Sequence, residues 1–172
     1  MSYAALYHTE FYSLDVGDLN NDNYLDIVVS NPEYNNLVVF LNLGNGTFNK
    51  QEIYYTDEDT SPEIIILGDL NNDHHLDIVV ILNGINKLSL LLGYGDGTFK
   101  IGNHYLIANK SELYSAVLGD LDNDGNLDIA ISSVGIGNIG ILFGYGDGTF
   151  KNIASLLIDT DFLPYFIGID DF

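Results

Sequence analysis

The sequence predicts an all-β fold made of three copies of one unit. Three short signatures, Gly-Asp-Leu, Leu-Asp-Ile and Gly-x-Gly-Thr-Phe, each occur three times. Each returns after 51 residues, without slippage: they begin at residues 17, 68 and 119, at 25, 76 and 127, and at 44, 95 and 146. No stretch of ten or more residues has helical periodicity. Such a constant step indicates a repeat architecture.

Each unit is expected to hold four short strands. In the second unit these are Glu63–Leu67, Leu76–Leu82, Lys87–Leu92 and Ile101–Ile107. The second strand of each unit is apolar at successive positions, which predicts a strand that is covered on both faces. The Asp-Gly pair at residues 96–97 supplies the positive φ of a tight turn between the third and fourth strands.

Four antiparallel strands in a unit of this length predict β-propeller blades, with a β-solenoid as the alternative. We expect residues 1–172 to be a single domain of three blades. Residues 3–7 align with a fourth strand, and Asp171-Phe172 aligns with the start of another unit. Three blades form an incomplete ring, because a closed propeller needs roughly four to eight. The expectation is therefore a piece of a larger propeller, or copies that self-associate to close one.

The composition is strongly acidic, with 25 acidic and 5 basic residues and a formal net charge of −20. So few cations exclude binding to nucleic acid and to anionic membrane surfaces. The chain has no cysteine, which excludes disulfides, thiolate metal sites and cysteine nucleophiles. We find no signal peptide in the first 20 residues and no apolar run long enough for membrane insertion.

Much of the acidic excess lies in three loops between the first and second strands. Oxygen side chains stand at positions 1, 3, 5 and 9 of each loop: Asp18, Asn20, Asp22 and Asp26; Asp69, Asn71, Asp73 and Asp77; Asp120, Asp122, Asp124 and Asp128. The backbone carbonyl of position 7, in Tyr24, His75 or Asn126, is a further candidate ligand. Oxygen ligands on a short flexible loop suit calcium better than magnesium or transition metals. We expect one calcium ion per unit, and an Asp/Asn turn without metal is the alternative.

The loops differ from an EF-hand, because strands flank them and position 12 holds Val29, Val80 or Ile131 instead of glutamate. A left-handed backbone is expected at position 6. Glycine occupies that position only in the third loop, as Gly125.

The pattern Gly-Asp-Leu-x-x-Asp-x-x-Leu-Asp-Ile followed by Gly-x-Gly-Thr-Phe resembles the FG-GAP/VCBS repeats, over nearly the whole chain. Those repeats build the propeller of integrin α subunits and of many extracellular adhesion, lectin-like and enzyme-associated proteins. The resemblance implies calcium at the positions named above and an extracellular or cell-surface location. Fold alone does not define the ligand.

We therefore expect a non-enzymatic, calcium-binding module for adhesion or for recognition of a protein or glycan ligand. The alternatives are an accessory propeller of a carbohydrate- or lipid-active enzyme and a structural spacer. Tyr94 and Tyr145, before the Gly-Asp-Gly turns, are candidates for sugar stacking or for turn packing. Glycosylation sequons begin at Asn45, where a turn role is favoured, and at Asn109.

Overall fold

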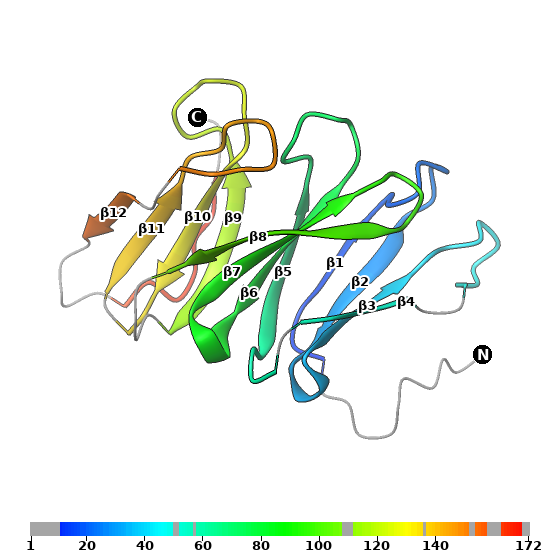
Figure 1. Ribbon diagram of the computed structural model, residues 1–172, viewed down its shortest axis with the longest axis horizontal. Coiled ribbons are helices and arrows are strands. Elements are labelled where there is room, and N and C mark those ends of the chain that lie inside the picture. The colour runs from blue at the N-terminus through cyan, green and yellow to red at the C-terminus, as the bar shows by residue number, and fades with distance from the viewer. Residues whose placement is uncertain are drawn as a thin grey trace.

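A computed structural model describes residues 11–49, 52–56, 58–107, 112–135, 137–151, 154–157 and 163–169. Within these residues, twelve strands form three separate four-stranded antiparallel sheets (Figure 1). The expected fold class of three four-stranded antiparallel blades in an incomplete ring is confirmed. The expected strand at residues 3–7 and the repeat start at Asp171-Phe172 lie outside the described residues.

The strands of each sheet follow one another in chain order. The first sheet contains β1 (Leu14–Gly17), β2 (Asp26–Asn31), β3 (Asn36–Phe40) and β4 (Glu52–Tyr55). The second contains β5 (Pro62–Gly68), β6 (Asp77–Leu82), β7 (Lys87–Gly93) and β8 (Phe99–Leu106). The third contains β9 (Leu113–Gly119), β10 (Asp128–Ser133), β11 (Asn138–Leu142) and β12 (Ala154–Leu157). Short 3-10 turns, Pro32–Tyr34 and Asn83–Ile85, join the second and third strands of the first two sheets.

The second strands are buried on both faces, as their continuous apolar runs predict. All six residues of β6 are buried, and β6 pairs with β5 on one side and β7 on the other. Its side chains alternate between two hydrophobic clusters: Ile78 and Val80 pack toward the first sheet, and Val79 and Ile81 toward the third. The sheets therefore stack face to face, as propeller blades do.

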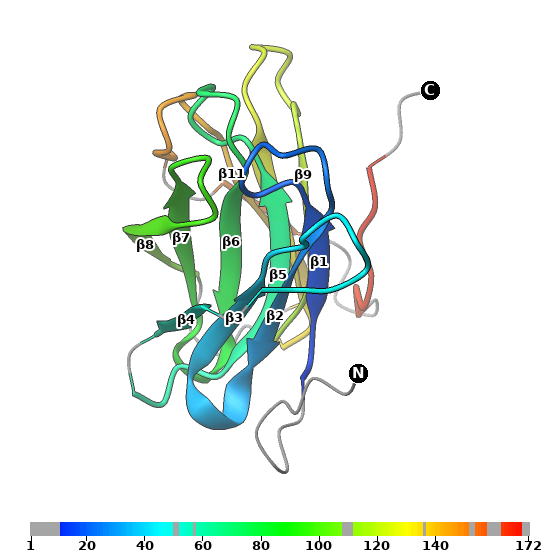
Figure 2. The same ribbon diagram turned by 90° about the vertical axis from the view of Figure 1, so that its right-hand side faces the viewer.

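The first strands β1, β5 and β9 lie side by side at the inner edge of the three blades (Figure 2). The approach is close because glycine ends each strand: a Cβ on Gly17 would lie 2.5 Å from Leu76 Cδ1. Side chains also join the strands, since Ser13 Oγ accepts the backbone N–H of Ile65 at 3.2 Å. Asp15 Oδ2 accepts that of Leu67 at 2.9 Å.

Away from the inner edge, a tyrosine of each of the first two blades packs on the Gly-x-Gly-Thr-Phe phenylalanine of the next blade. The rings of Tyr54 and Phe99 meet edge to face at 5.5 Å, and those of Tyr105 and Phe150 at 5.8 Å. The backbone N–H of Phe150 also donates to the Tyr105 hydroxyl at 2.9 Å. The seam between blades thus repeats with the sequence.

The segment 163–169 continues the repeat beyond the third sheet. The backbone N–H of Ile167 donates to Ser115 Oγ at 3.4 Å, as Ile65 does to Ser13 one seam earlier. Ile169 lies against Gly119, where a Cβ would meet its side chain at 2.7 Å. The segment therefore follows the path of a first strand beside β9 (Figure 1). No helix in the described part of the chain is long and apolar enough to cross a membrane.

Candidate metal centres

The three aspartate-rich loops connect β1 to β2, β5 to β6 and β9 to β10, and they lie at one end of the blades (Figure 2). One hydrogen-bond framework shapes all three. The carboxylate at position 1 accepts the backbone N–H groups of positions 5 and 6, and the carboxylate at position 5 accepts that of position 7. In the third loop, Gly125 donates to Asp120 Oδ2 at 2.8 Å and Asn126 donates to Asp124 Oδ1 at 2.8 Å. The same turn conformation therefore recurs in all three loops, and among the described residues the third loop alone brings three carboxylates within 4.8 Å of one another.

Two positions in each loop have a left-handed backbone. Position 6 has φ of 66° at Asn23, 66° at His74 and 88° at Gly125, which confirms the expectation for that position. Position 4 has φ of 58° at Asn21, 59° at Asn72 and 60° at Asn123. Asparagine tolerates this region better than most residues. The left-handed backbone at position 4 was not predicted from the sequence, although the same residue recurs there at the 51-residue step.

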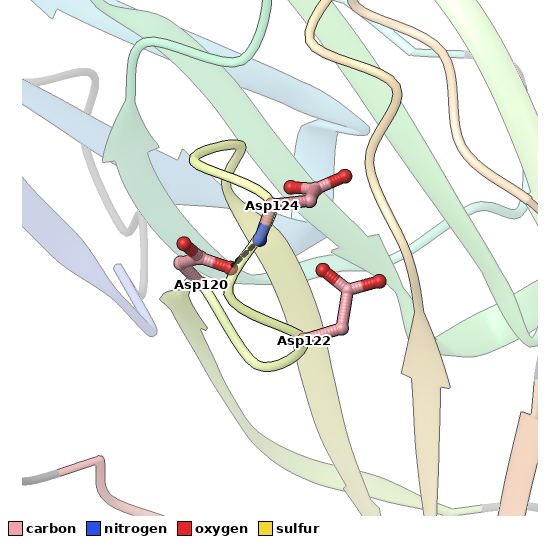
Figure 3. A group of neighbouring side chains, drawn as sticks. All are labelled: Asp120, Asp122 and Asp124. Carbon is pink, nitrogen blue, oxygen red and sulfur yellow. Dashed lines mark hydrogen bonds between the residues drawn. The ribbon is translucent and has the colours of Figure 1, made fainter.

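The third loop brings three carboxylates together (Figure 3). Oxygens of Asp120, Asp122 and Asp124 lie within 4.8 Å of one another, and the three side chains are exposed. Desolvation raises the pKa of Asp122, and the negative charges of Asp124, Asp128 and Asp120 raise it further. Such a group favours either a proton or a cation.

In the first and second loops, an asparagine amide takes the place of the position-3 carboxylate and donates a hydrogen bond to the carboxylate at position 5. Asn20 Nδ2 donates to Asp22 Oδ2 at 2.9 Å, and Asn71 Nδ2 donates to Asp73 Oδ2 at 2.9 Å. Because aspartate replaces this asparagine at position 122, the third loop lacks the equivalent N–H donor. The third loop consequently has the strongest electrostatic demand for a cation.

The aspartate at position 9 has a different environment from the other three. Asp26, Asp77 and Asp128 are completely buried. In the second blade, Asp77 Oδ2 accepts the backbone N–H of Leu70 at 2.9 Å and Oδ1 accepts that of Gly93 at 2.8 Å. The same pair of bonds recurs in the first and third blades. Position 9 thus ties the loop to the end of the third strand, a role that was not predicted from the sequence.

Burial dominates the electrostatics of Asp26 and Asp77. It raises the pKa of Asp26, and it raises that of Asp77 to about 6, although two backbone N–H donors oppose the shift. Each oxygen of a carboxylate has a second lone pair besides the one that accepts a hydrogen bond. Position 9 therefore ties the loop to the third strand and keeps free lone pairs, but Asp128 is not among the three third-loop carboxylates that lie within 4.8 Å of one another.

Position 7, expected to offer its backbone carbonyl, also carries a link between neighbouring loops. Asn21 of the first loop has its Nδ2 at 2.9 Å from His75 Nδ1 of the second. Asn72 of the second loop donates from Nδ2 to Asn126 Oδ1 of the third, also at 2.9 Å. In the first loop, Tyr24 instead lies against Gly44.

The donor set fits calcium. It is built from carboxylate, amide and carbonyl oxygens on an exposed, asparagine-rich loop, which is the kind of ligand set that calcium takes in irregular geometry. Within each loop, the side chains at positions 1, 3, 5 and 9 and the carbonyl at position 7 would hold the ion. His74 lies at the loop surface with Nδ1 3.8 Å from Asp69 Oδ2.

The remaining sequence candidates lie in turns. Tyr94 and Tyr145 are exposed, and each backbone N–H donates to the threonine of its Gly-Asp-Gly-Thr turn. Asn45 Oδ1 accepts the backbone N–H of Thr47 at 3.0 Å, as Asp96 does from Thr98, so Asn45 has the expected turn role. The sequon at Asn109 lies outside the described residues.

The repeated sheets, with one acidic loop on each inner strand, define the protein as a set of β-propeller blades. The FG-GAP-like repeat matches residues 18–80 and 77–131, about two thirds of the chain. The chain therefore belongs to the FG-GAP-like repeat family. No curated protein sequence matches it.

Solved structures with a similar fold are propellers of greater length. Virginiamycin B lyase from Staphylococcus aureus, in its catalytically inactive H270A form with quinupristin, gives a TM-score of 0.63 at 17% identity. It is matched over 92% of this chain and 45% of its own. A lectin from Agrocybe aegerita that recognises non-reducing terminal N-acetylglucosamine gives 0.56 at 23% identity, over 86% of this chain and 38% of its own. This chain thus spans less than half of either structure, and the likeness concerns the fold.

Proposed function

We propose that this chain is a calcium-binding, non-enzymatic propeller module that recognises a protein or glycan ligand outside the cell. The observation that carries the calcium assignment is the third loop, where Asp120, Asp122 and Asp124 converge within 4.8 Å. Among the described residues, no lysine or histidine pairs with these three carboxylates. A divalent cation offsets their mutual repulsion.

Two further features support one ion per blade. The hydrogen-bond framework of positions 1, 5, 6 and 7 is the same in all three loops, so each loop presents its oxygens in the same order. Binding of three divalent ions would also reduce the magnitude of the formal net charge of −20. Calcium in the millimolar range, as outside cells, suffices for the weak sites of extracellular modules.

The recognition role rests on the fold and its relatives. The FG-GAP-like family and the lectin structure both place this chain among propellers, a fold that presents loops at both ends of a rigid ring. The recognition surface is proposed to belong to the loops, with calcium holding the loops at one end. Catalysis is not part of the proposal, because carboxylates that hold a metal are poor proton shuttles.

The test is thermal unfolding of the purified chain in calcium, in magnesium and in chelator. An ion that binds only the native state at a hundredfold excess over its Kd adds about 2.7 kcal/mol per site. We expect chelator to lower the Tm markedly and calcium to restore it better than magnesium. An unchanged melting curve in chelator contradicts the calcium assignment.

A further inference from the structure

A cavity of about 590 Å³ opens at the end of the inner strands that is remote from the aspartate-rich loops. Its lining comes from the starts of three first strands and from the segment 163–169. The lining includes Tyr12, Glu63, Asn83, Tyr114 and Phe166. The volume lies within the range of about 300–1,000 Å³ that small-molecule sites occupy.

The repeat explains how these side chains meet. Tyr12, Glu63 and Tyr114 occupy one repeat position, 51 residues apart, at the start of successive blades. Because β1, β5 and β9 lie side by side at the inner edge, this position converges on the cavity. Glutamate thus replaces the aromatic residue in the middle blade and places one carboxylate between two tyrosines.

The aromatic side chains are accessible rather than packed into a core. Tyr12 is 65% exposed, Tyr114 is 54% exposed and Phe166 is more exposed still. The ring of Tyr114 meets that of Tyr165 edge to face at 5.2 Å, which fixes its orientation. Open aromatic faces attract cations through the ring quadrupole.

The Glu63 carboxylate is held in place and has no cationic partner among the described residues. Its Oε2 accepts Asn83 Nδ2 at 2.9 Å, and its Oε1 accepts the hydroxyl of Ser61 at 3.2 Å. Asn83 is itself oriented, since its Oδ1 accepts the backbone N–H of Leu113 at 3.3 Å. The cavity therefore combines one fixed negative charge with exposed aromatic faces, and its lining includes no Lys, Arg or His among the residues that the structure describes.

We propose that this cavity binds a quaternary ammonium group. Each Glu63 oxygen already accepts one hydrogen bond, so this carboxylate keeps about two acceptor sites, fewer than the three N–H donors of a primary ammonium group or the five of a guanidinium group. A trimethylammonium group donates none and needs only a nearby negative charge and aromatic faces. The inference names a ligand class for the proposed recognition role, and it does not depend on calcium.

The test uses choline and its neutral isostere 3,3-dimethylbutan-1-ol, titrated calorimetrically into the wild-type chain in calcium-containing buffer and again in chelator. We expect saturable binding of choline and at least about tenfold weaker binding of the neutral compound. Equal affinity for the two compounds overturns the proposal, as does the absence of saturable choline binding in calcium. If choline binds while the melting curve ignores chelator, the calcium assignment fails and the cavity stands.

Matched variants locate the site. Glu63→Gln keeps the length of the side chain and removes the charge, and its amide is able to accept from Asn83 and to donate to the Ser61 hydroxyl. Tyr114→Leu removes an aromatic face. Each is expected to weaken choline binding by about tenfold. The controls Glu33→Gln and Tyr145→Leu, both exposed and away from the cavity lining, are expected to leave binding unchanged. If the control variants lose as much affinity for choline as Glu63→Gln does, choline binds elsewhere on the chain, and the proposal is overturned.

Two further titrations distinguish the possible sources of the quaternary ammonium group. Tighter binding of an N-acetylated trimethyllysine amide than of choline assigns the ligand to a modified protein, and the reverse order assigns it to a small molecule or a headgroup. Saturable binding of N-acetylglucosamine without binding of choline overturns the proposal in favour of a sugar site.

Discussion

Asn21 Nδ2 of the first aspartate-rich loop lies 2.9 Å from His75 Nδ1 of the second loop. The same amide donates to the carbonyl of Gly95 at 3.1 Å, so one asparagine contacts both the loop and the turn of the next blade. Asn72 repeats the arrangement with Asn126 and Gly146. Since position 7 is also a candidate calcium ligand through its carbonyl, each of the first two loops contacts a residue of the next candidate metal site.

This link predicts coupling between neighbouring sites. Replacing Asn72 by glycine keeps the left-handed backbone at position 4 and removes the contact with Asn126. The loss of one hydrogen bond, about 0.5–1.5 kcal/mol, should weaken calcium binding in the third loop about two- to tenfold. Calorimetric titration measures the effect. Asn21→Gly is the control, because its contact is with the second loop, and an equal effect of both variants on the tightest site contradicts the coupling.

The three sites should differ in affinity, in the order third, first, second. The third loop has four aspartates and Gly125 at position 6, whereas His74 holds the same left-handed backbone in the second loop at a strain of order 1 kcal/mol. Single alanine substitutions of Asp18, Asp69 and Asp120, each titrated with calcium, test the order. Loss of the tightest class in Asp69→Ala rather than in Asp120→Ala would show that loop charge and position 6 do not set affinity.

Position 9 should matter for folding even without metal. Replacing Asp77 by alanine leaves the buried N–H groups of Leu70 and Gly93 without their acceptor. Each unsatisfied buried donor costs about 1–3 kcal/mol, so unfolding by urea in chelator should reveal a large loss of stability. Asp120→Ala, in an exposed loop position, should destabilise the chain mainly when calcium is present. Equal losses in chelator for both variants would remove the distinction between the two positions.

The metal-free chain should become less stable as pH rises. The folded-state pKa of Asp77 is about 6 against an ordinary value of 3.8, because burial penalises its charged form. The native state therefore binds the proton more tightly than the unfolded state does. The corresponding stability is fully present below the ordinary pKa and is lost as pH rises through about 6. Urea unfolding of dialysed, metal-free protein at pH 5 and pH 7 measures this, and the Asp77→Asn variant should show a smaller difference between the two.

The two outer faces of the blade stack should associate, either with further blades or with a second copy. Leu19 and Leu70 are 2% exposed, whereas the equivalent Leu121 of the third blade is 37% exposed. At the other end, Leu25 is 62% exposed, although the equivalent Leu76 packs against the preceding blade. Light scattering should detect self-association of the isolated chain.

Aspartate in place of both Leu25 and Leu121 is expected to reduce this association, since it puts charge on each seam face. Aspartate in place of Leu43, an exposed leucine of the first Gly-x-Gly-Thr-Phe turn, is the control. If the wild-type chain stays monomeric at all concentrations, the prediction is wrong. The chain is then an open wedge of three blades.

Local sequence patterns predicted most of the strands. The four expected strands of the second blade lie within one or two residues of β5, β6, β7 and β8, because alternating burial and turn chemistry are properties of short segments. The left-handed backbone at position 6 was also predictable, since Gly125 marks it in one of the three loops.

The contacts between distant residues were not predictable in the same way. One of the two hydrogen bonds that Asp77 accepts comes from Gly93, which is 16 residues away. Gly93 reaches the carboxylate only once β6 and β7 have paired. The cavity requires Tyr12, Glu63 and Tyr114 to converge, and their shared repeat position gives that information only after the inner strands are known to lie side by side. Such arrangements depend on how blades stack and not on the order of residues within one blade.

The seam between blades has a consequence for how such a chain changes in length. Ile65 meets Ser13 and Ile167 meets Ser115 across a separation of 52 residues, and Phe99 and Phe150 each meet a tyrosine 45 residues earlier. Each of these contacts joins a unit to its immediate neighbour, and none of them depends on where in the chain the two units lie. Duplication or deletion of a 51-residue stretch would therefore rejoin compatible surfaces wherever the cut falls, so genes of this kind are able to gain or lose whole blades without redesigning any interface.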